Sequence, residues 1–212
     1  MIEFRDVVKN IKGNNVINHV SFSISSGEII GIKGINGSGK TMLLRLIAGL
    51  IIPTSGEILV NGKMIGKEIN HPENIGVLIE NPSFLGSYSG LENLQILASI
   101  RHRVTQETLI FLLKQVGLEQ AIHLKYKKYS LGMKQRLGIA AAVMENPDII
   151  LLDEPTNALD LDGIKMVKNT IIAHHTRGAT IIVASHDIDF LSEISTRVIT
   201  IDHGQIEMGV NI

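Results

Sequence analysis

Eight consecutive residues in the N-terminal part of the chain have the types and the spacing of a phosphate-binding loop. Residues 34–41 read Gly-Ile-Asn-Gly-Ser-Gly-Lys-Thr and fit the pattern G-x-x-x-x-G-K-[ST], between an expected strand and an expected helix. Glycines let backbone N–H groups turn towards phosphate oxygens, and the helix N-terminus adds the positive end of its dipole. Lys40 then supplies charge to the β- and γ-phosphates, and Thr41 offers a hydroxyl to Mg²⁺. A glycine-rich turn without a ligand is the alternative, which this context disfavours. The residues expected to bind nucleotide are Gly34, Asn36, Gly37, Ser38, Gly39, Lys40, Thr41 and Met42.

A second chemical element is a strand that ends in two carboxylates. Residues 148–154 read Asp-Ile-Ile-Leu-Leu-Asp-Glu. Such an apolar run is typical of a strand buried in a parallel sheet, whose carboxyl end faces the ligand crevice. We therefore expect Asp153 to hold Mg²⁺ and Glu154 to polarise the water that attacks the γ-phosphate. By itself a strand that ends in Asp-Glu is more often a solvated strand end, so this interpretation depends on the phosphate-binding loop.

The elements that must position these residues form an α/β pattern. Short β-branched runs alternate with helical patterns, which indicates βα units and a parallel sheet. The first strands alternate more strictly and lie near turn residues, so an antiparallel β-part is expected before the parallel core. The expected strands are residues 3–8, 16–24, 28–33, 56–60, 75–79, 149–152, 180–184, 197–202 and 205–208.

The middle third of the chain is expected to be helical. No good strand pattern appears between Leu91 and Asn146, whereas apolar spacing predicts helices. We therefore expect a single domain, residues 1–212, with a helical lobe inserted into its α/β core. The core comprises residues 1–80 and 147–212, and the lobe residues 81–146. Expected helices cover residues 41–48, 91–101, 106–116 and 131–145.

The charge balance, the cysteine content and the length of the apolar runs limit which partners and which locations are expected for the chain. The chain has 20 Lys and Arg against 21 Asp and Glu, with no basic run, so nucleic acid has no electrostatic support as a partner. The absence of Cys excludes disulfides and thiol catalysis. No apolar run approaches the roughly 18–20 residues that cross a bilayer, and the first residues do not read as a signal peptide. The adjacent His174 and His175 are expected to be surface residues, because neighbouring helical positions point in different directions.

Five further motifs follow in a fixed order, and together they resemble the nucleotide-binding domains of ABC ATPases. Residues 130–136 (Ser-Leu-Gly-Met-Lys-Gln-Arg) resemble the family's signature motif, and residues 157–160 (Asn-Ala-Leu-Asp) its D-loop. Residues 185–187 (Ser-His-Asp) resemble the segment of its switch histidine. Residues 75–82 occupy the Q-loop position, and residues 90–94 (Gly-Leu-Glu-Asn-Leu) match the start of the helical lobe. The resemblance extends over nearly the whole chain.

The resemblance implies an ABC-type P-loop ATPase that uses ATP and Mg²⁺. It also implies a homodimer that forms with ATP, separate transmembrane permease subunits, and a cytoplasmic, peripheral location on the inner face of the membrane. Ser130 has the character of an N-cap for the following helix, and in the family that helix closes on the partner subunit's ATP; the alternative is that Ser130 is only a cap. His186 is implied to contact the γ-phosphate. The implied site residues are Glu154, His186 and Lys40 for catalysis, Ser130, Gly132 and Met133 in the signature, Asp160 in the D-loop, and Thr41, Asp153 and Glu80 at the metal.

The sequence departs from the family pattern at several places. Leu131 and Met133 stand where the signature has Gly and Gln, Glu80 replaces the Q-loop Gln, and Ile11 replaces the aromatic that stacks on adenine. Glu80 together with residues 129–136 resembles the ATPases of bacitracin-resistance and lantibiotic self-protection exporters, which implies export of, or immunity to, an antimicrobial peptide. We expect Glu80 to tune metal binding; the alternative is a solvated loop acid.

Two other classes of function remain to be weighed. A soluble ABC ATPase that acts on DNA or ribosomes typically has a coiled-coil insertion or a second ATPase domain, and the sequence shows neither. A non-hydrolysing, ATP-gated clamp is disfavoured by the intact Lys40, Asp153, Glu154 and His186. The transported molecule is not encoded here, because the permease selects it.

Overall fold

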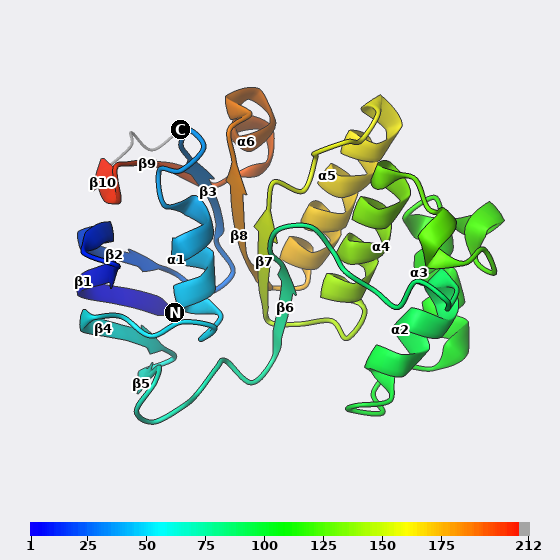
Figure 1. The fold of residues 1–212 in the computed structure, drawn as a ribbon, viewed down its shortest axis with the longest axis horizontal. Coiled ribbons are helices and arrows are strands. Elements are labelled where there is room, and N and C mark those ends of the chain that lie inside the picture. Colours follow the sequence, from blue (N-terminus) through cyan, green and yellow to red (C-terminus); the bar gives the residue numbers. More distant parts are fainter. Residues whose placement is uncertain (208–212) are drawn as a thin grey trace.

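The computed structural model describes residues 1–207, which form two β-sheets and six α-helices (Figure 1). The strands are β1 Ile2–Ile11, β2 Asn14–Ile24, β3 Ile29–Lys33, β4 Ser55–Val60, β5 Lys63–Met64, β6 Ile75–Leu78, β7 Ile149–Asp153, β8 Thr180–Ser185, β9 Arg197–Asp202 and β10 Gln205–Glu207. The helices are α1 Lys40–Ile47, α2 Gly90–Ala98, α3 Gln106–Gln115, α4 Leu131–Val143, α5 Leu161–Thr176 and α6 Ile188–Ile194, with 3-10 turns η1 Glu119–Ala121 and η2 Tyr126–Lys128.

Helix α1 lies between the two sheets. The antiparallel sheet has the strand order β2-β1-β4-β5, and the six-stranded sheet has the order β10-β9-β3-β8-β7-β6. In the larger sheet β6, β7, β8, β3 and β9 are parallel, and only β10 is antiparallel to its neighbour. Helix α1 contacts β2 on one side and β7 and β8 on the other. The predicted class, a mainly parallel α/β sheet with an antiparallel β-part, is confirmed.

The larger sheet is buried on both faces, which explains the apolar runs of its strands. Along β7, Ile149 and Leu151 join the core beneath α1, whereas Ile150 and Leu152 join the core on the opposite face. Parallel pairing also aligns the strand ends, because Leu78 of β6 lies opposite Leu152 and Ala184 of β8 lies opposite Asp153. The carboxyl ends of these strands therefore meet at one edge of the sheet.

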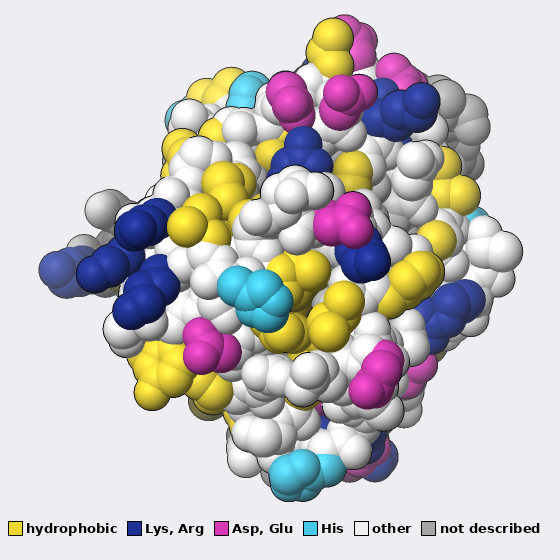
Figure 2. Space-filling model, turned by 90° about the vertical axis from the view of Figure 1, so that its right-hand side faces the viewer, with side chains coloured by type: hydrophobic (Ala, Val, Ile, Leu, Met, Phe, Trp, Pro, Cys, Tyr) yellow, Lys and Arg dark blue, Asp and Glu magenta, His cyan; other side chains and the backbone are white. Residues whose placement is uncertain are grey.

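The remaining helices cover the face of the sheet away from α1. Helix α4 contacts β6 and β7, α5 contacts β8, and α6 contacts β3, while α2 and α3 form an outer layer against α4 (Figure 1). Exposed apolar side chains on the outer layer include Ile96, Ile100 and Phe111. Figure 2 views the molecule from this side and shows hydrophobic side chains interspersed with charged ones. None of the helices in the part of the chain that the structure describes is long and apolar enough to cross a membrane.

Several element ends differ from the sequence prediction. The second predicted helix, 91–101, begins one residue earlier and ends at Ala98, since a capping box of Ser89 and Glu92 starts the helix at Gly90. Strand β5 was not predicted because two residues carry no periodicity. The last predicted strand is present as β10, but its final residue, Met208, lies outside the described residues.

The prediction that both histidines of α5 lie on the surface is wrong for His174. Its side chain is buried, and its Nδ1 lies 3.1 Å from Nη1 of Arg177. Burial lowers the pKa of His174, and the charge of Arg177 lowers it further. His174 is therefore a neutral side chain packed inside the fold, where its Nδ1 accepts a hydrogen bond from the guanidinium.

Candidate active site

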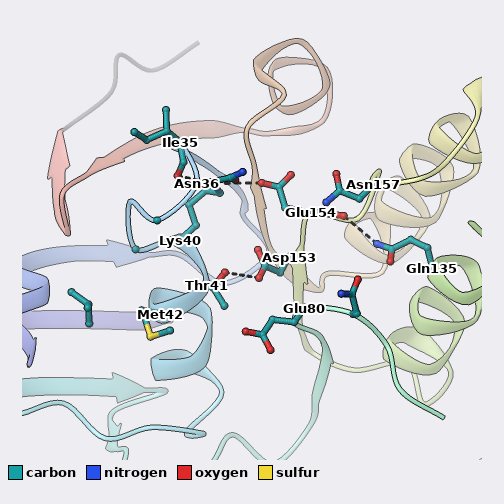
Figure 3. Close-up of a pocket in the computed structure, with 14 residues that line it drawn as sticks. Ile35, Asn36, Lys40, Thr41, Met42, Glu80, Gln135, Asp153, Glu154 and Asn157 are labelled. Atoms are coloured by element: carbon teal, nitrogen blue, oxygen red, sulfur yellow. Dashed lines mark hydrogen bonds and ion pairs between the residues drawn. The ribbon is translucent and has the colours of Figure 1, made fainter. Parts of the chain in front are cut away.

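A cleft of about 510 Å³ opens where α1 begins and the parallel strands end (Figure 3). Its walls come from segments that are far apart in the sequence: the loop before α1, the segment after β6, the end of β7, and one side chain of α4. The lining residues are Val16, Ile35, Asn36, Gly37, Gly39, Lys40, Thr41, Met42, Glu80, Asn81, Gln135, Asp153, Glu154 and Asn157.

Glycine is required by the packing of the loop between β3 and α1. A Cβ on Gly34 would lie 2.3 Å from Oγ of Ser38 and 2.6 Å from the carbonyl oxygen of Ile201, so the backbone can pass there only without a side chain. Gly39 precedes α1 with a φ of 115°, which is left-handed backbone that favours glycine. Among the described residues no side chain caps α1, so its first N–H groups remain available to an anion from outside.

Lys40 is buried at the floor of this loop. Its Nζ donates hydrogen bonds to the carbonyl oxygens of Gly34 at 2.6 Å and Ile35 at 3.2 Å, and it lies 3.4 Å from Oε1 of Glu154 (Figure 3). The backbone of the loop thus surrounds the ammonium group of Lys40. An incoming phosphate meets a positive charge that is already largely removed from water, where charge attracts charge more strongly than at the surface.

Thr41 and Asp153 join the start of α1 to the end of β7. Oγ1 of Thr41 donates a 2.7 Å hydrogen bond to Oδ2 of Asp153, whose side chain is buried. Burial raises the pKa of Asp153, against the hydrogen bond from Thr41, which lowers it; the nearby Glu154 raises it further. A hydroxyl and a carboxylate side by side are oxygen ligands of the kind that Mg²⁺ prefers.

Glu154 is the most constrained carboxylate of the site. Its φ is 45°, and its backbone N–H donates to the carbonyl oxygen of Ala184 at 2.8 Å. One carboxylate oxygen, Oε2, is held by Nδ1 of His186 at 2.8 Å and by the hydroxyl of Ser185 at 3.2 Å. The other oxygen, Oε1, is buried and accepts no hydrogen bond from any described residue. Glu154 therefore presents a free acceptor to the cleft next to the Lys40 ammonium.

Glu80 contributes to the cleft wall, and its carboxylate is engaged by a helix. It follows β6 with a φ of 60°, and its Oε1 lies 2.6 Å from Nη2 of Arg45 on α1. In Figure 3 the side chain extends from the end of β6 towards α1, beside the Thr41–Asp153 pair. The structure thus places Glu80 near the predicted metal ligands but bound to Arg45, and its metal role stays a prediction.

Ser130, Gly132, Met133 and Asp160 do not line this cleft, whereas Gln135 of the signature and Asn157 of the D-loop do. Ser130 caps α4, accepting a 3.2 Å hydrogen bond from the Met133 N–H, as the sequence predicts. A Cβ on Gly132 would lie 2.8 Å from the carbonyl oxygen of Ala158. Asp160 caps α5 by accepting a hydrogen bond from the Gly163 N–H. Arg136, which belongs to the signature helix α4, donates to the same carboxylate at 2.9 Å.

Sequence reasoning missed some of the cleft. Gln135 of α4 is buried and donates through Nε2 to the Glu154 carbonyl oxygen at 3.1 Å. Its place within the signature motif, residues 130–136, was the available signal. Val16 adds apolar wall, which no motif indicates, whereas Ile11, predicted at the adenine position, does not line the cleft. Ile35 of the glycine-rich loop, Asn81 of the Q-loop segment and Asn157 of the D-loop complete the lining, although no role was predicted for them.

The comparisons with known proteins agree with this geometry. The family model described as ABC transporter matches residues 17–157, which is more than half of the chain and includes the loop, the signature and the Asp153–Glu154 pair. The chain belongs to the ABC transporter family. The predicted membership, and with it the ATPase activity, is confirmed, and the chain is an ATP-binding subunit of an ABC transporter.

Relatives within the ABC transporter family match over nearly the whole chain. The chain is 42% identical over 207 residues to the uncharacterized ABC transporter ATP-binding protein YybJ of Bacillus subtilis, covering 98% of this chain and 95% of that protein. It is 36% identical to the bacitracin transport ATP-binding protein BcrA of Enterococcus faecalis, covering 100% and 70%. It is 31% identical to the lantibiotic transport ATP-binding protein SrtF of Streptococcus pyogenes, covering 97% and 89%.

A solved structure has the same fold. The ATP-binding cassette MJ0796, in a dimeric post-hydrolysis state bound to ADP and Pi, superposes on this ABC transporter protein with a TM-score of 0.90 at 26% identity, covering 100% of this chain and 98% of that one.

Proposed function

We propose that this ABC transporter subunit binds MgATP in the cleft, hydrolyses it with Glu154 as general base, and thereby energises a separate membrane permease that exports, or gives immunity to, an antimicrobial peptide. The observation that carries the chemistry is the free Oε1 of Glu154, placed 3.4 Å from the Lys40 ammonium and opposite an oxygen held by His186. Oε1 is buried and accepts no hydrogen bond from the described residues, while the contacts to Oε2 orient the carboxylate, so Oε1 can accept a proton in the cleft.

Binding begins with a change of partner for Lys40. When the phosphates enter the loop, the ammonium exchanges the Gly34 and Ile35 carbonyl oxygens for phosphate oxygens. The exchange also moves positive charge away from Oε1 of Glu154, which leaves that oxygen free for the attacking water. The N–H groups of the loop and of the first turn of α1 surround the phosphates, where the helix dipole favours negative charge.

Thr41 and Asp153 fit the position of the divalent cation. Their adjacent oxygens, one neutral and one anionic, would hold the cation together with nucleotide phosphates and water. The cation would neutralise charge on the β- and γ-phosphates. It would also favour the ionised form of Asp153, against the burial and the charge of Glu154 that raise the pKa of this carboxyl.

Hydrolysis then uses Glu154 and His186 together. Oε1 of Glu154 accepts a proton from the water while the water oxygen bonds to the γ-phosphorus and the bond to the bridging oxygen of ADP breaks. His186 holds Oε2 of Glu154 through Nδ1 and keeps the carboxylate in one orientation. Its exposed ring is available to the γ-phosphate, which is the role proposed for it.

A second copy of the chain completes the site in this proposal. Ser130, Gly132 and Met133 lie at the exposed start of α4, outside their own cleft, where helix N–H groups suit an anion brought by a partner. Residues 1–80 and 147–212 act as the nucleotide-binding core, and residues 81–146 as the helical subdomain that carries this motif. The dimeric structure of the similar cassette MJ0796 supports a homodimer.

The substrate class rests on the named relatives. BcrA is described as a bacitracin transport protein and SrtF as a lantibiotic transport protein. Glu80 and the Ser-Leu-Gly-Met signature, which resemble that subgroup, support the same assignment for this chain, on the inner face of the membrane beside its permease.

This assignment can be tested in cells. A strain that produces the Glu154→Gln variant in place of the wild type is expected to become several-fold more sensitive to bacitracin or to a lantibiotic, and no more sensitive to a ribosome-directed antibiotic. Glu119→Gln, the same change in an exposed acid paired with Lys114, is the matched control and should leave sensitivity unchanged. The tagged wild type should also co-purify with a multi-span membrane protein. Unchanged sensitivity to both peptides, or co-sedimentation with ribosomes instead of membranes, would contradict the proposal.

A further inference from the structure

One face of α1 carries two side chains that each bind a carboxylate at a strand end. Thr41 and Arg45 are four residues apart and therefore lie one above the other on the helix. Thr41 binds Asp153 at the end of β7 at 2.7 Å, and Arg45 binds Glu80 just after β6 at 2.6 Å. Because β6 and β7 are neighbouring parallel strands, the Arg45–Glu80 pair is adjacent to the proposed cation ligands.

The backbone of Glu80 also lies close to Asp153. Leu78 of β6 lies opposite Leu152 of β7, so Glu80, two residues further on, is level with the end of β7, and Glu80 and Asp153 line the same cleft. The carboxylate of Glu80 is thus kept from the Thr41–Asp153 pair by the direction of its side chain, not by the position of its backbone. Its side chain is 59% exposed and that of Arg45 is 30% exposed, so the ion pair is largely solvated and easily exchanged.

We propose that Arg45 is a positioning residue that holds the Glu80 carboxylate against α1 and competes for it with the divalent cation of the nucleotide. This inference rests on the proposed function, since the cation position is the one assigned to Thr41 and Asp153 there. In this proposal Glu80 has two alternative cationic partners, the Arg45 guanidinium and the divalent cation. A glutamine at position 80 would lack the negative charge for which Arg45 and the cation compete.

The exchange of partners has a path to the helical layer. The segment after Glu80 is tied to that layer at two points: the Tyr126 hydroxyl donates to the Pro82 carbonyl oxygen at 2.5 Å, and the Leu85 N–H donates to Oδ1 of Asn93 on α2 at 2.8 Å. Glu80 therefore lies at the start of a segment that is anchored to the helical layer.

The test is the Mg²⁺ concentration that half-saturates the Mg²⁺-dependent part of ATP binding, measured by calorimetry in the Glu154→Gln background so that ATP is not consumed. Arg45→Gln is expected to lower this concentration roughly two- to fivefold, the change expected from removing a competing exposed ion pair. Arg45→Lys keeps the charge and should stay near the unmodified value. Arg5→Gln removes a comparable exposed pair with Glu3, 2.6 Å apart on β1, and should change nothing.

A double-variant comparison decides whether Arg45 acts through Glu80. Glu80→Gln should raise the half-saturating Mg²⁺ concentration, and adding Arg45→Gln to it should have no further effect. An unchanged or higher value in Arg45→Gln, or an Arg45 effect that persists alongside Glu80→Gln, overturns the inference. If Asp153→Asn leaves the Mg²⁺ dependence intact, the proposed cation site itself fails; if Asp153→Asn removes it and Arg45→Gln has no effect, only this inference fails.

Discussion

Glu154→Gln should lower steady-state ATP hydrolysis by about 10²–10⁴-fold while ATP still binds. Glutamine retains the length and the acceptor oxygen of the side chain but cannot take a proton from water at neutral pH. The contacts from Ser185 and His186 are preserved in part, so the fold around β7 and β8 should be unaffected. Phosphate release measures the hydrolysis, and ATP calorimetry under the same conditions measures the binding.

The control for this variant is Glu119→Gln, which makes the same chemical change on the surface and should hydrolyse ATP at the wild-type rate. Turnover in Glu154→Gln within a few-fold of the wild type would remove Glu154 from the role of general base. Hydrolysis and binding lost together would instead indicate that the variant has disturbed the cleft as a whole.

Lys40→Ala is expected to act one step earlier, on the binding of the nucleotide. The ammonium is buried and is the cation closest to the inside of the loop, so its loss should cost about 2–5 kcal/mol, or roughly 30-fold or more in Kd. Alanine also leaves the Gly34 and Ile35 carbonyl oxygens without their donor. The Kd for ATP, from calorimetry or from a fluorescent analogue, is the measurement.

Lys33→Ala is the matched control, since Lys33 is exposed at the end of β3 and does not line the cleft. A Kd for Lys40→Ala equal to that of Lys33→Ala would show that the ammonium does not bind phosphate. The expected order is therefore near-wild-type affinity for Lys33→Ala and Glu154→Gln, and a large loss for Lys40→Ala only.

Much of the fold could be predicted from local patterns. A few consecutive residues are enough to predict the glycine-rich loop, the buried strand before Asp153 and the β-branched strands. Because parallel strands align their carboxyl ends, the approach of Thr41 to Asp153, separated by 112 residues, follows from the fold class.

Contacts that depend on how the elements pack against one another could not be predicted from the sequence. Arg45 meets Glu80 only because α1 packs against β7 and β8, next to the end of β6, and the sequence of neither segment indicates this contact. Gln135 reaches the Glu154 backbone because α4 packs on β6 and β7. His174 is buried by tertiary contacts of α5, which residue spacing alone did not reveal.

We expect ATP to be held between two copies of this chain, with the cleft of one closed by Ser130 of the other. The most direct measurement is the molar mass of Glu154→Gln by sedimentation, with Mg²⁺ and either ATP or ADP, at a protein concentration well above any plausible dissociation constant. We expect a dimer with ATP, a monomer with ADP, and a monomer with ATP when Ser130→Arg is added. A monomer under all conditions, or a dimer that Ser130→Arg does not disrupt, would contradict it.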